Sequence, residues 1–210
     1  MSSVAASLPD AEPPARKLTA RGRDRRQALL SYAIKRFAEN GYHPTSVSDI
    51  VDGIGVGKGV FYWYFPSKDD MLLEILREAL YDLRTFQQAE LRAAEDPIQR
   101  LELGIRASLR WSSDHQDILR ITMFCWTEET FAKALRKGRR IIVADTAKHV
   151  QAGIDLGLIA PGDPAMLATA IRGVTDELAR SYAVGASDLD EEVVVLAVRM
   201  CLHGVVGAKP

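Results

Sequence analysis

The stretch Thr45–Lys68, TSVSDIVDGIGVGKGVFYWYFPSK, decides the fold of this chain of 210 residues. It predicts a helix, a glycine turn and a second short helix. Thr45 or Ser46 can cap the first helix, because a hydroxyl oxygen accepts a hydrogen bond from an amide that has no partner within the helix. Asp49 follows Ser46 at the spacing of a capping box, which predicts where this helix begins.

Glycine and proline set the turn and the end of the second helix. Gly53 and Gly55 supply the turn, since glycine adopts a positive φ without steric cost. The second helix begins at Lys58 and stops at Phe65, before Pro66. Two short helices that meet at a steep angle leave the second free to lie in a major groove, so the stretch indicates a DNA-binding helix-turn-helix.

A third helix is predicted upstream, over residues 27–40, and it ends at Asn40-Gly41. Its apolar residues recur at spacings of three and four and form one stripe: Leu30, Ala33, Ile34, Phe37 and Ala38. Helices of about eight residues cannot bury a core alone, and Phe37 is suited to pack against Phe61. The sequence therefore predicts a three-helix DNA-binding domain.

These residues resemble the TetR-type family of transcriptional regulators. The resemblance is dense between Arg25 and Leu72 and rests on four motifs: F-A-E-N-G-Y at 37–42, T-S-x-x-D-I at 45–50, G-V-x-K-G at 55–59 and Y-x-Y-F-P-S-K at 62–68. Beyond Leu72 it thins to G-L-I-A-P-G-D-P at 157–164. The resemblance implies an all-α fold, in which the three-helix domain is joined by a long helix to a helical ligand-binding and dimerisation domain.

The resemblance also implies partners and a set of DNA contacts. A homodimer would bind a double-stranded operator with an inverted repeat, usually as a repressor, and a small-molecule effector would release it. By motif position the DNA-binding residues are Thr45, Ser46, Ser48, Gly57, Lys58, Gly59, Val60, Tyr62, Trp63, Tyr64 and Lys68.

The chemistry of several of these residues agrees with such roles. Lys58 places a charge on a phosphate or a guanine edge, Gly59 lets the backbone approach closely, and Val60 offers a methyl surface to thymine. Two residues depart from the family pattern, because Gly57 replaces the common Ser or Thr and Trp63 is bulkier than many residues at its position. The operator sequence therefore cannot be inherited from a relative.

Basic residues are concentrated where DNA would lie. Residues 16–68 contain ten Lys and Arg against four Asp and Glu, although the whole chain has a net charge of −1. Six of the ten stand before the predicted first helix: Arg16, Lys17, Arg21, Arg23, Arg25 and Arg26. This arm either contacts DNA or is a solvated tail, and the sequence leaves both open. The acidic remainder argues against a surface that wraps nucleic acid or lies on an anionic membrane.

Composition divides the chain into three parts. Residues 1–20 lack periodicity and are predicted to be a disordered tail with a basic end. The helix-turn-helix domain follows over 21–67, and the effector-binding and dimerisation domain over 68–210. Without a signal peptide or an apolar run of roughly 20 residues, we expect a cytoplasmic protein with no membrane partner, found on the nucleoid when it holds DNA. Cys125 and Cys201 are expected to be separate reduced thiols.

The second domain is predicted to be helical throughout. An apolar stripe over 68–94 indicates one long helix that runs from the DNA-binding domain into the second domain. Later helices are predicted from Pro97 with Asp96 as its cap, over 118–126, 130–156 and 164–184, and from Asp188 or Asp190 to about Val206. An effector bound between the middle helices would tilt the long helix and change the spacing of the two DNA-binding domains.

The last two helices are apolar on more than one face, which indicates a dimer interface built as a four-helix bundle. The residues predicted for this interface are Ile171, Val174, Leu178, Val194, Ala197, Val198 and Cys201. The alternative is a monomer that packs both helices inside itself.

The effector site is predicted from large or polar side chains on the middle helices. The candidates are Phe86, Gln87, Trp111, Met123, Phe124, Trp126, Asp176 and Tyr182. Each is also a candidate for the core. Their composition favours an apolar or aromatic effector.

Two other classes of function were weighed. An enzyme is disfavoured, because the glycine-rich segment lacks the Gly and Ser or Thr that a phosphate loop needs at Asp52 and Gly59, and no strand precedes it. The four histidines lack the spacing of a catalytic or metal site, so we expect no catalytic residues, no metal and no cofactor. A helical adaptor without DNA binding is disfavoured by Lys58, Tyr62 and Lys68.

Overall fold

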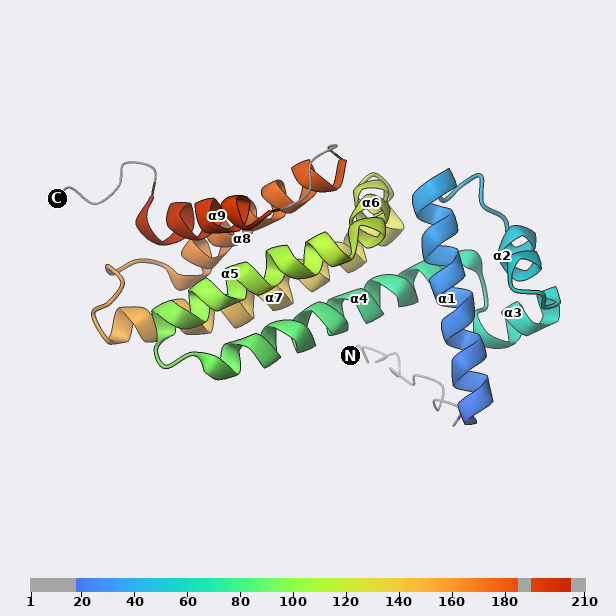
Figure 1. The fold of residues 1–210 in the computed structure, drawn as a ribbon, viewed down its shortest axis with the longest axis horizontal. Coiled ribbons are helices and arrows are strands. Elements are labelled where there is room, and N and C mark those ends of the chain that lie inside the picture. Colours follow the sequence, from blue (N-terminus) through green and yellow to red (C-terminus); the bar gives the residue numbers. More distant parts are fainter. Residues whose placement is uncertain (1–17, 185–189, 205–210) are drawn as a thin grey trace, which may run out of the picture.

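The computed structural model describes residues 18–184 and 190–204. Within these residues the chain forms nine α-helices and one short 3₁₀ helix, and no strand, which confirms the all-α fold (Figure 1). The elements are α1 (Ala20–Asn40), α2 (Val47–Gly53), α3 (Lys58–Tyr64), α4 (Lys68–Glu90), η1 (Leu91–Ala93), α5 (Pro97–Asp114), α6 (Gln116–Cys125), α7 (Glu129–Asp155), α8 (Pro164–Val184) and α9 (Glu191–His203).

The first helix begins earlier than its apolar periodicity predicts. Helix α1 starts at Ala20, where the Thr19 side chain accepts a hydrogen bond from Gly22 N at 3.2 Å. The first turns of α1 contain charged residues and lack an apolar stripe, because they extend past the core. Arg26 anchors this end to α4, with Nη2 at 2.6 Å from Glu74 Oε1 and Nη1 at 2.5 Å from Glu78 Oε1. The predicted basic arm is thus helical from Ala20 onward, and its first residues lie outside the described part of the chain.

The helix-turn-helix forms as the caps and glycines predict. Ser46, rather than Thr45, caps α2, and Ser46 and Asp49 make both hydrogen bonds of the capping box. Gly55 turns the chain with a φ of 68°. Gly53 has a different role from the one predicted: it remains in α2, where a side chain would collide with the ring of Tyr32.

The core of the three-helix domain continues into the second domain. Leu30 of α1, Ile50 of α2 and Phe61 of α3 are buried together with Met71 and Leu72 at the start of α4. The same cluster extends to residues of α5, α6 and α7: Trp111, Ile118, Ile121, Cys125, Phe131 and Ile142. Helix α6 lies beside α1, as Figure 1 shows. The two domains therefore meet along a packed contact in addition to the covalent connection through α4.

In the second domain α5 lies centrally and contacts α4, α7, α8 and α9 (Figure 1). Pro97 opens α5, and Asp96 caps it by accepting from the amides of Ile98 and Gln99 at 2.7 and 2.9 Å, as predicted. Asp190 caps α9; the alternative cap, Asp188, lies outside the described residues. Among the described helices, none combines the length and apolar character needed to span a bilayer.

A core substitution in α3 tests the importance of this shared cluster. Phe61 is fully buried, so Phe61→Ala should lower the free energy of unfolding by about 3–5 kcal/mol, measured by urea titration at a fixed protein concentration. Tyr62→Ala on the same helix is the control. Its side chain is 55% exposed, and its loss should cost no more than about 1 kcal/mol. Equal losses for the two variants would contradict the assignment of Phe61 to the core.

Candidate nucleic-acid interface and ligand cavity

The outward face of α3 carries most of the residues predicted to bind DNA. Lys58 and Gly59 are exposed, and the side chains of Tyr62 and Trp63 are 55% and 52% exposed. Apart from the adjoining backbone, no atom of the described residues lies within 4 Å of where a Cβ at Gly57 or Gly59 would stand. The backbone at the start of α3 is therefore open to a partner, and this helix stands at one end of the molecule (Figure 1).

A groove runs between α3 and the start of α1. From α3 it is lined by Gly59, Val60, Trp63 and Tyr64, and from α1 by Thr19, Arg21, Gly22 and Arg25. Arg21 and Arg25 are one turn apart, and among the described residues neither has an ion-pair partner, whereas Arg26 is bound to α4. The helical spacing of Arg21 and Arg25 is the sequence signal that distinguishes them from the rest of the basic arm.

Three predicted phosphate contacts are engaged inside the protein. Thr45 is only 2% exposed, and its hydroxyl donates to Gly41 O at 2.8 Å, so its side chain cannot reach DNA as predicted. Lys68 Nζ donates to Tyr42 O and Thr45 O at 2.8 Å each. Burial lowers the pKa of Lys68. Tyr64 donates its hydroxyl hydrogen to Gly22 O at 2.9 Å.

The contacts of Thr45 and Lys68 have a common cause. The loop between α1 and α2 exposes carbonyl groups that need donors, and Lys68 and Thr45 supply them. Ser46 is exposed, but its hydroxyl is held in the capping box, and Ser48 is half-buried. Next to this loop, the side chains that remain available to DNA are those on the outward face of α3 and those of Arg21 and Arg25 on α1.

A cavity of about 440 Å³ lies in the second domain, between α4, η1, α5, α7 and α8. Its lining includes apolar and polar residues together: Arg84, Gln87, Gln88, Leu91, Arg92, Arg100, Leu101, Gly104, Ile105, Ser108, Ile142, Asp145, Thr146, Lys148, His149, Ile171, Arg172 and Thr175. Its volume falls within the range of roughly 300–1,000 Å³ that small-molecule sites occupy.

Of the eight predicted effector residues, only Gln87 lines this cavity. Phe86, Met123 and Tyr182 are half-buried elsewhere. Trp111 is buried, and its Nε1 donates to Asp82 Oδ2 at 2.7 Å. Phe124 stacks on Tyr42 with ring centroids 5.3 Å apart, and Trp126 is exposed at the end of α6. Phe86, Trp111 and Phe124 belong to, or pack against, the buried cluster shared by the two domains, and they do not line the cavity.

The cavity is rich in positive charge. Five cationic side chains line it, Arg84, Arg92, Arg100, Lys148 and Arg172, against one carboxylate, that of Asp145. Such a lining does not match the apolar or aromatic effector that the sequence predicts. Burial lowers the pKa of His149, helped by the charge of Arg100.

Two ion pairs tie the cavity helices together. Nε and Nη2 of Arg84, on α4, donate to Asp145 Oδ2 of α7 at 2.9 and 2.8 Å. Lys148 Nζ donates to the other oxygen of Asp145 at 3.0 Å. Burial alone would raise the pKa of Asp145, but these hydrogen bonds outweigh it and hold the pKa below its usual range. Asp145 is therefore a carboxylate with both oxygens occupied.

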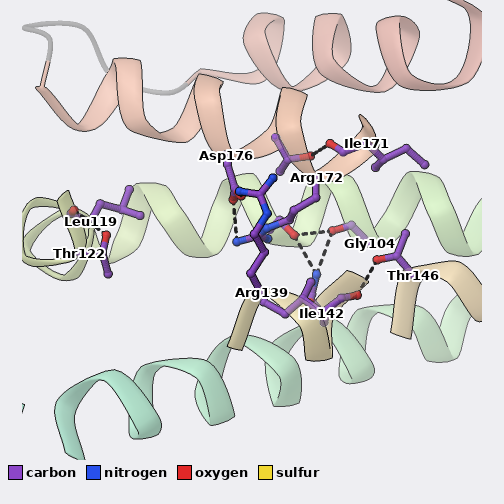
Figure 2. A network of polar contacts seen from close by, with 12 residues as sticks. Gly104, Leu119, Thr122, Arg139, Ile142, Thr146, Ile171, Arg172 and Asp176 are labelled. Carbon is purple, nitrogen blue, oxygen red and sulfur yellow. Dashed lines mark hydrogen bonds and ion pairs between the residues drawn. The ribbon is translucent and has the colours of Figure 1, made fainter. Parts of the chain in front are cut away.

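The second pair joins α8 to α7 and includes the predicted Asp176. Figure 2 shows Asp176 between Arg172 of its own helix and Arg139 of α7. Arg172 Nη2 lies 2.6 Å from Asp176 Oδ1, and Arg139 Nη1 lies 3.2 Å from Asp176 Oδ2. Arg172 Nε is buried and has no hydrogen-bond partner among the described residues. A buried donor without an acceptor costs about 1–3 kcal/mol.

The predicted dimer residues lie on the inner face of α9 and against the core. Val194, Ala197 and Val198 are buried in a second cluster with Ile105 and Leu109 of α5. Ile171, Leu178 and Cys201 pack against the same cluster, and Val174 is half-buried. Among the described residues, the large apolar side chains that remain exposed on α8 and α9 are Met166, Leu167, Val195, Leu196 and Met200. The inner and outer stripes of α9 are both apolar, so the sequence pattern alone does not separate them.

Among the described residues, no three His, Cys, Asp or Glu side chains are grouped so that they could hold a metal ion. The two histidines nearest to carboxylates are each paired with one acidic residue, His43 with Glu128 and His115 with Asp82.

Comparison with known proteins accounts for both halves of the chain. Residues 29–75 match the model of the tetR family of bacterial regulatory proteins, and residues 94–205 match that of the tetracyclin repressor-like C-terminal domain. The transcriptional repressor KstR2 of Mycobacterium tuberculosis is 36% identical over 91 residues, 43% of this chain and 46% of that protein.

Two solved structures share the fold over most of its length. FadR from Bacillus subtilis in complex with stearoyl-CoA has a TM-score of 0.78 at 20% identity and covers 85% of this chain and 98% of that one. A transcriptional regulator from Saccharomonospora viridis in complex with choline has a TM-score of 0.69 at 22% identity and covers 85% and 94%.

Arg25 and Lys58 are expected to act differently on DNA. Arg25→Ala should weaken binding to all duplexes alike and reduce the salt slope of binding by about 1, because one phosphate contact is lost. Lys58→Ala should cost about 1–3 kcal/mol on the preferred duplex and relax the preference at one base pair. Fluorescence anisotropy at several salt concentrations measures both. Identical behaviour of the two variants would mean that Lys58 contacts only phosphate.

Lys68 is expected to affect stability rather than DNA affinity. Lys68→Met keeps the aliphatic stem and removes two hydrogen bonds from a charged donor, so the free energy of unfolding should fall by about 1–3 kcal/mol. The salt slope of DNA binding should stay at its wild-type value. A slope reduced by about 1 would show that Lys68 also neutralises a phosphate.

Proposed function

The chain belongs to the TetR family of bacterial regulatory proteins, and we propose that it represses transcription by binding an inverted-repeat operator. The protein dissociates from this operator when a small molecule occupies the cavity between α4, α5, α7 and α8. The observation that supports this most directly is the course of α4. The helix begins in the core of the helix-turn-helix domain and carries Arg84, Gln87 and Gln88 into the cavity lining.

The proposed operator contacts come from α3 and α1. Lys58, Gly59 and Val60 face base edges in the major groove, where a charge, a close backbone and a methyl surface each favour particular bases. Tyr62 and Trp63 lie against the phosphate backbone. To these predicted residues we add Arg21 and Arg25, because both line the groove next to α3 and have no ion-pair partner among the described residues.

The proposed dimer uses the outer face of α8 and α9. Val195, Leu196 and Met200 form an exposed apolar stripe, and a second copy of the chain would cover it by two-fold symmetry. Two copies of α3 would then stand about 34–36 Å apart, which is one turn of DNA. The four-helix bundle of the sequence prediction is retained, with its contact residues moved to the outer stripe.

The proposed release mechanism runs along α4. At the cavity, Arg84 ties α4 to Asp145 of α7. Toward the other end, Glu74 and Glu78 tie the same helix to Arg26 of α1. A ligand that moves α4 against α7 would therefore move α1, and α3 with it. This coupling must be reciprocal, so operator DNA would weaken effector binding by the same factor.

The ligand of this chain does not follow from its fold. The two liganded neighbours hold stearoyl-CoA and choline, which are chemically unlike, so the shared fold does not identify an occupant for the cavity of this chain.

The function is tested by selecting random duplexes on the purified protein at near-physiological salt and sequencing those retained. Enrichment of an inverted repeat would support a dimeric, sequence-specific regulator and would supply the operator for release assays. A folded dimer that enriches no sequence, even after extensive dialysis to remove co-purified ligand, would contradict the proposal.

The dimer face has its own test. Leu196→Glu places a charge in the outer stripe, so it should weaken dimerisation at least about tenfold, or 1.4 kcal/mol, in light-scattering dilution series. Operator affinity should fall with it. Leu158→Glu is the matched control, because Leu158 is also an exposed leucine but lies between α7 and α8. A Leu196→Glu protein that remains a dimer at wild-type dilution would remove this face from the interface.

A further inference from the structure

The charges of the cavity lining are not balanced within the protein. Arg84 and Lys148 share the one carboxylate of the lining, Asp145, and Arg172 pairs with Asp176. Across residues 18–184 and 190–204, Arg92 and Arg100 have no ion-pair partner. Both side chains are exposed to solvent, so an incoming counter-charge can meet them without breaking an ion pair. In the same lining, burial lowers the pKa of His149, and the charge of Arg100 lowers it further.

Four neutral polar side chains of the lining, Gln87, Ser108, Thr146 and Thr175, already donate within the protein. Gln87 Nε2 donates to Ser108 Oγ at 2.8 Å, and the hydroxyls of Ser108 and Thr175 donate to carbonyls of their own helices at 3.0 and 2.8 Å. Thr146 does the same at 3.1 Å. By contrast, Arg172 Nε is buried without an acceptor. An occupant that satisfies this site must bring acceptor oxygens.

A cationic occupant would find no free carboxylate among the described lining residues. Asp145, the one carboxylate of that lining, already accepts from Arg84 through one oxygen and from Lys148 through the other. A positive ligand would have to displace one of these cations and would add to the excess charge. The lining therefore discriminates by the sign of the charge.

The cavity also has an apolar side. Leu101, Ile105 and Ile142 are buried in its wall, and Leu91 and Ile171 line it as well. These side chains offer no polar atoms, so they fit a hydrocarbon segment of the occupant. A small inorganic anion would leave this side and most of the volume unused.

From these observations we propose that the cavity binds an organic anion, a carboxylate or a phosphate monoester, with a hydrocarbon segment. The acidic group binds Arg172 and the two cations without a partner, Arg92 and Arg100, and the hydrocarbon segment lies against the isoleucine and leucine wall. The role of this ligand as the effector rests on the function proposed above. Its binding to the cavity is independent of that function.

Calorimetric titration of the DNA-free protein with a matched set of probes tests the proposal. Octanoate and octyl phosphate carry the two acidic groups on one tail, octanol is the neutral match, and octylammonium the cationic one. Acetate and inorganic phosphate carry the acidic group without the tail. At least one of the eight-carbon anions should bind once per subunit, and at least about tenfold tighter than octanol, octylammonium or its own short counterpart. Whichever of octanoate and octyl phosphate binds with higher affinity shows whether the ligand carries a carboxylate or a phosphate.

Charge-removing variants locate the binding. Arg172→Gln should weaken the bound anion about tenfold and leave octanol unchanged. Arg136→Gln is the matched control, because Arg136 lies on α7, is exposed and pairs with Glu129 outside the cavity. If Arg172→Gln unfolds at a lower temperature than the control, Arg100→Gln carries the same test, since Arg100 is exposed at the start of α5.

Three outcomes would overturn the proposal: octanol or octylammonium binding as tightly as the anions, no eight-carbon anion binding at millimolar concentration, or anion binding that neither Arg172→Gln nor Arg100→Gln weakens. The function proposed above fails separately. If an anion binds through Arg172 but does not release the selected operator, the cavity has the proposed ligand class without the proposed regulatory role.

Discussion

The short length of α2 and α3 is the constraint on which the rest of the structure depends. Each has seven residues, too few to be stable or to bury a core without help from elsewhere. They are held because α1 and the first turns of α4 complete a single buried cluster around Phe61. The helix that completes the DNA-binding domain is thus the one that continues into the cavity, so stability of the first domain and communication with the second depend on the same residues.

What the sequence could predict follows from how local each rule is. The capping box at Ser46, the turn at Gly55 and the Asp96-Pro97 start of α5 are decided by neighbouring residues, and all three were predicted. The beginning of α1 was placed too late because its first turns carry no stripe and are held by Glu74 and Glu78, which are about fifty residues away. Periodicity finds the helices that face a core and misses the turns that extend beyond it.

The site residues divide in the same way. The open residues of α3 were predicted from motif positions, whereas Thr45 and Lys68 could not be recognised as internal donors without knowing where the α1–α2 loop lies. The cavity is the space that remains between five packed elements, α4, η1, α5, α7 and α8. Neither the composition of the sequence nor the spacing of its residues can locate such a space. On α9, two apolar stripes were visible in the sequence, but only the packing of Val194 and Val198 against α5 shows which one is inside.

Contact between α6 and the first domain limits how the DNA-binding domain can move. Tyr42 of the α1–α2 loop packs on Phe124 and Phe131, with ring centroids 5.3 Å from each, while α4 continues unbroken into the second domain. A body attached at two separate points can pivot about the line through them but cannot slide along it. We therefore expect the first domain to rotate about this line, with little displacement near Tyr42 and the start of α4 and larger displacement in the parts that lie farther from both.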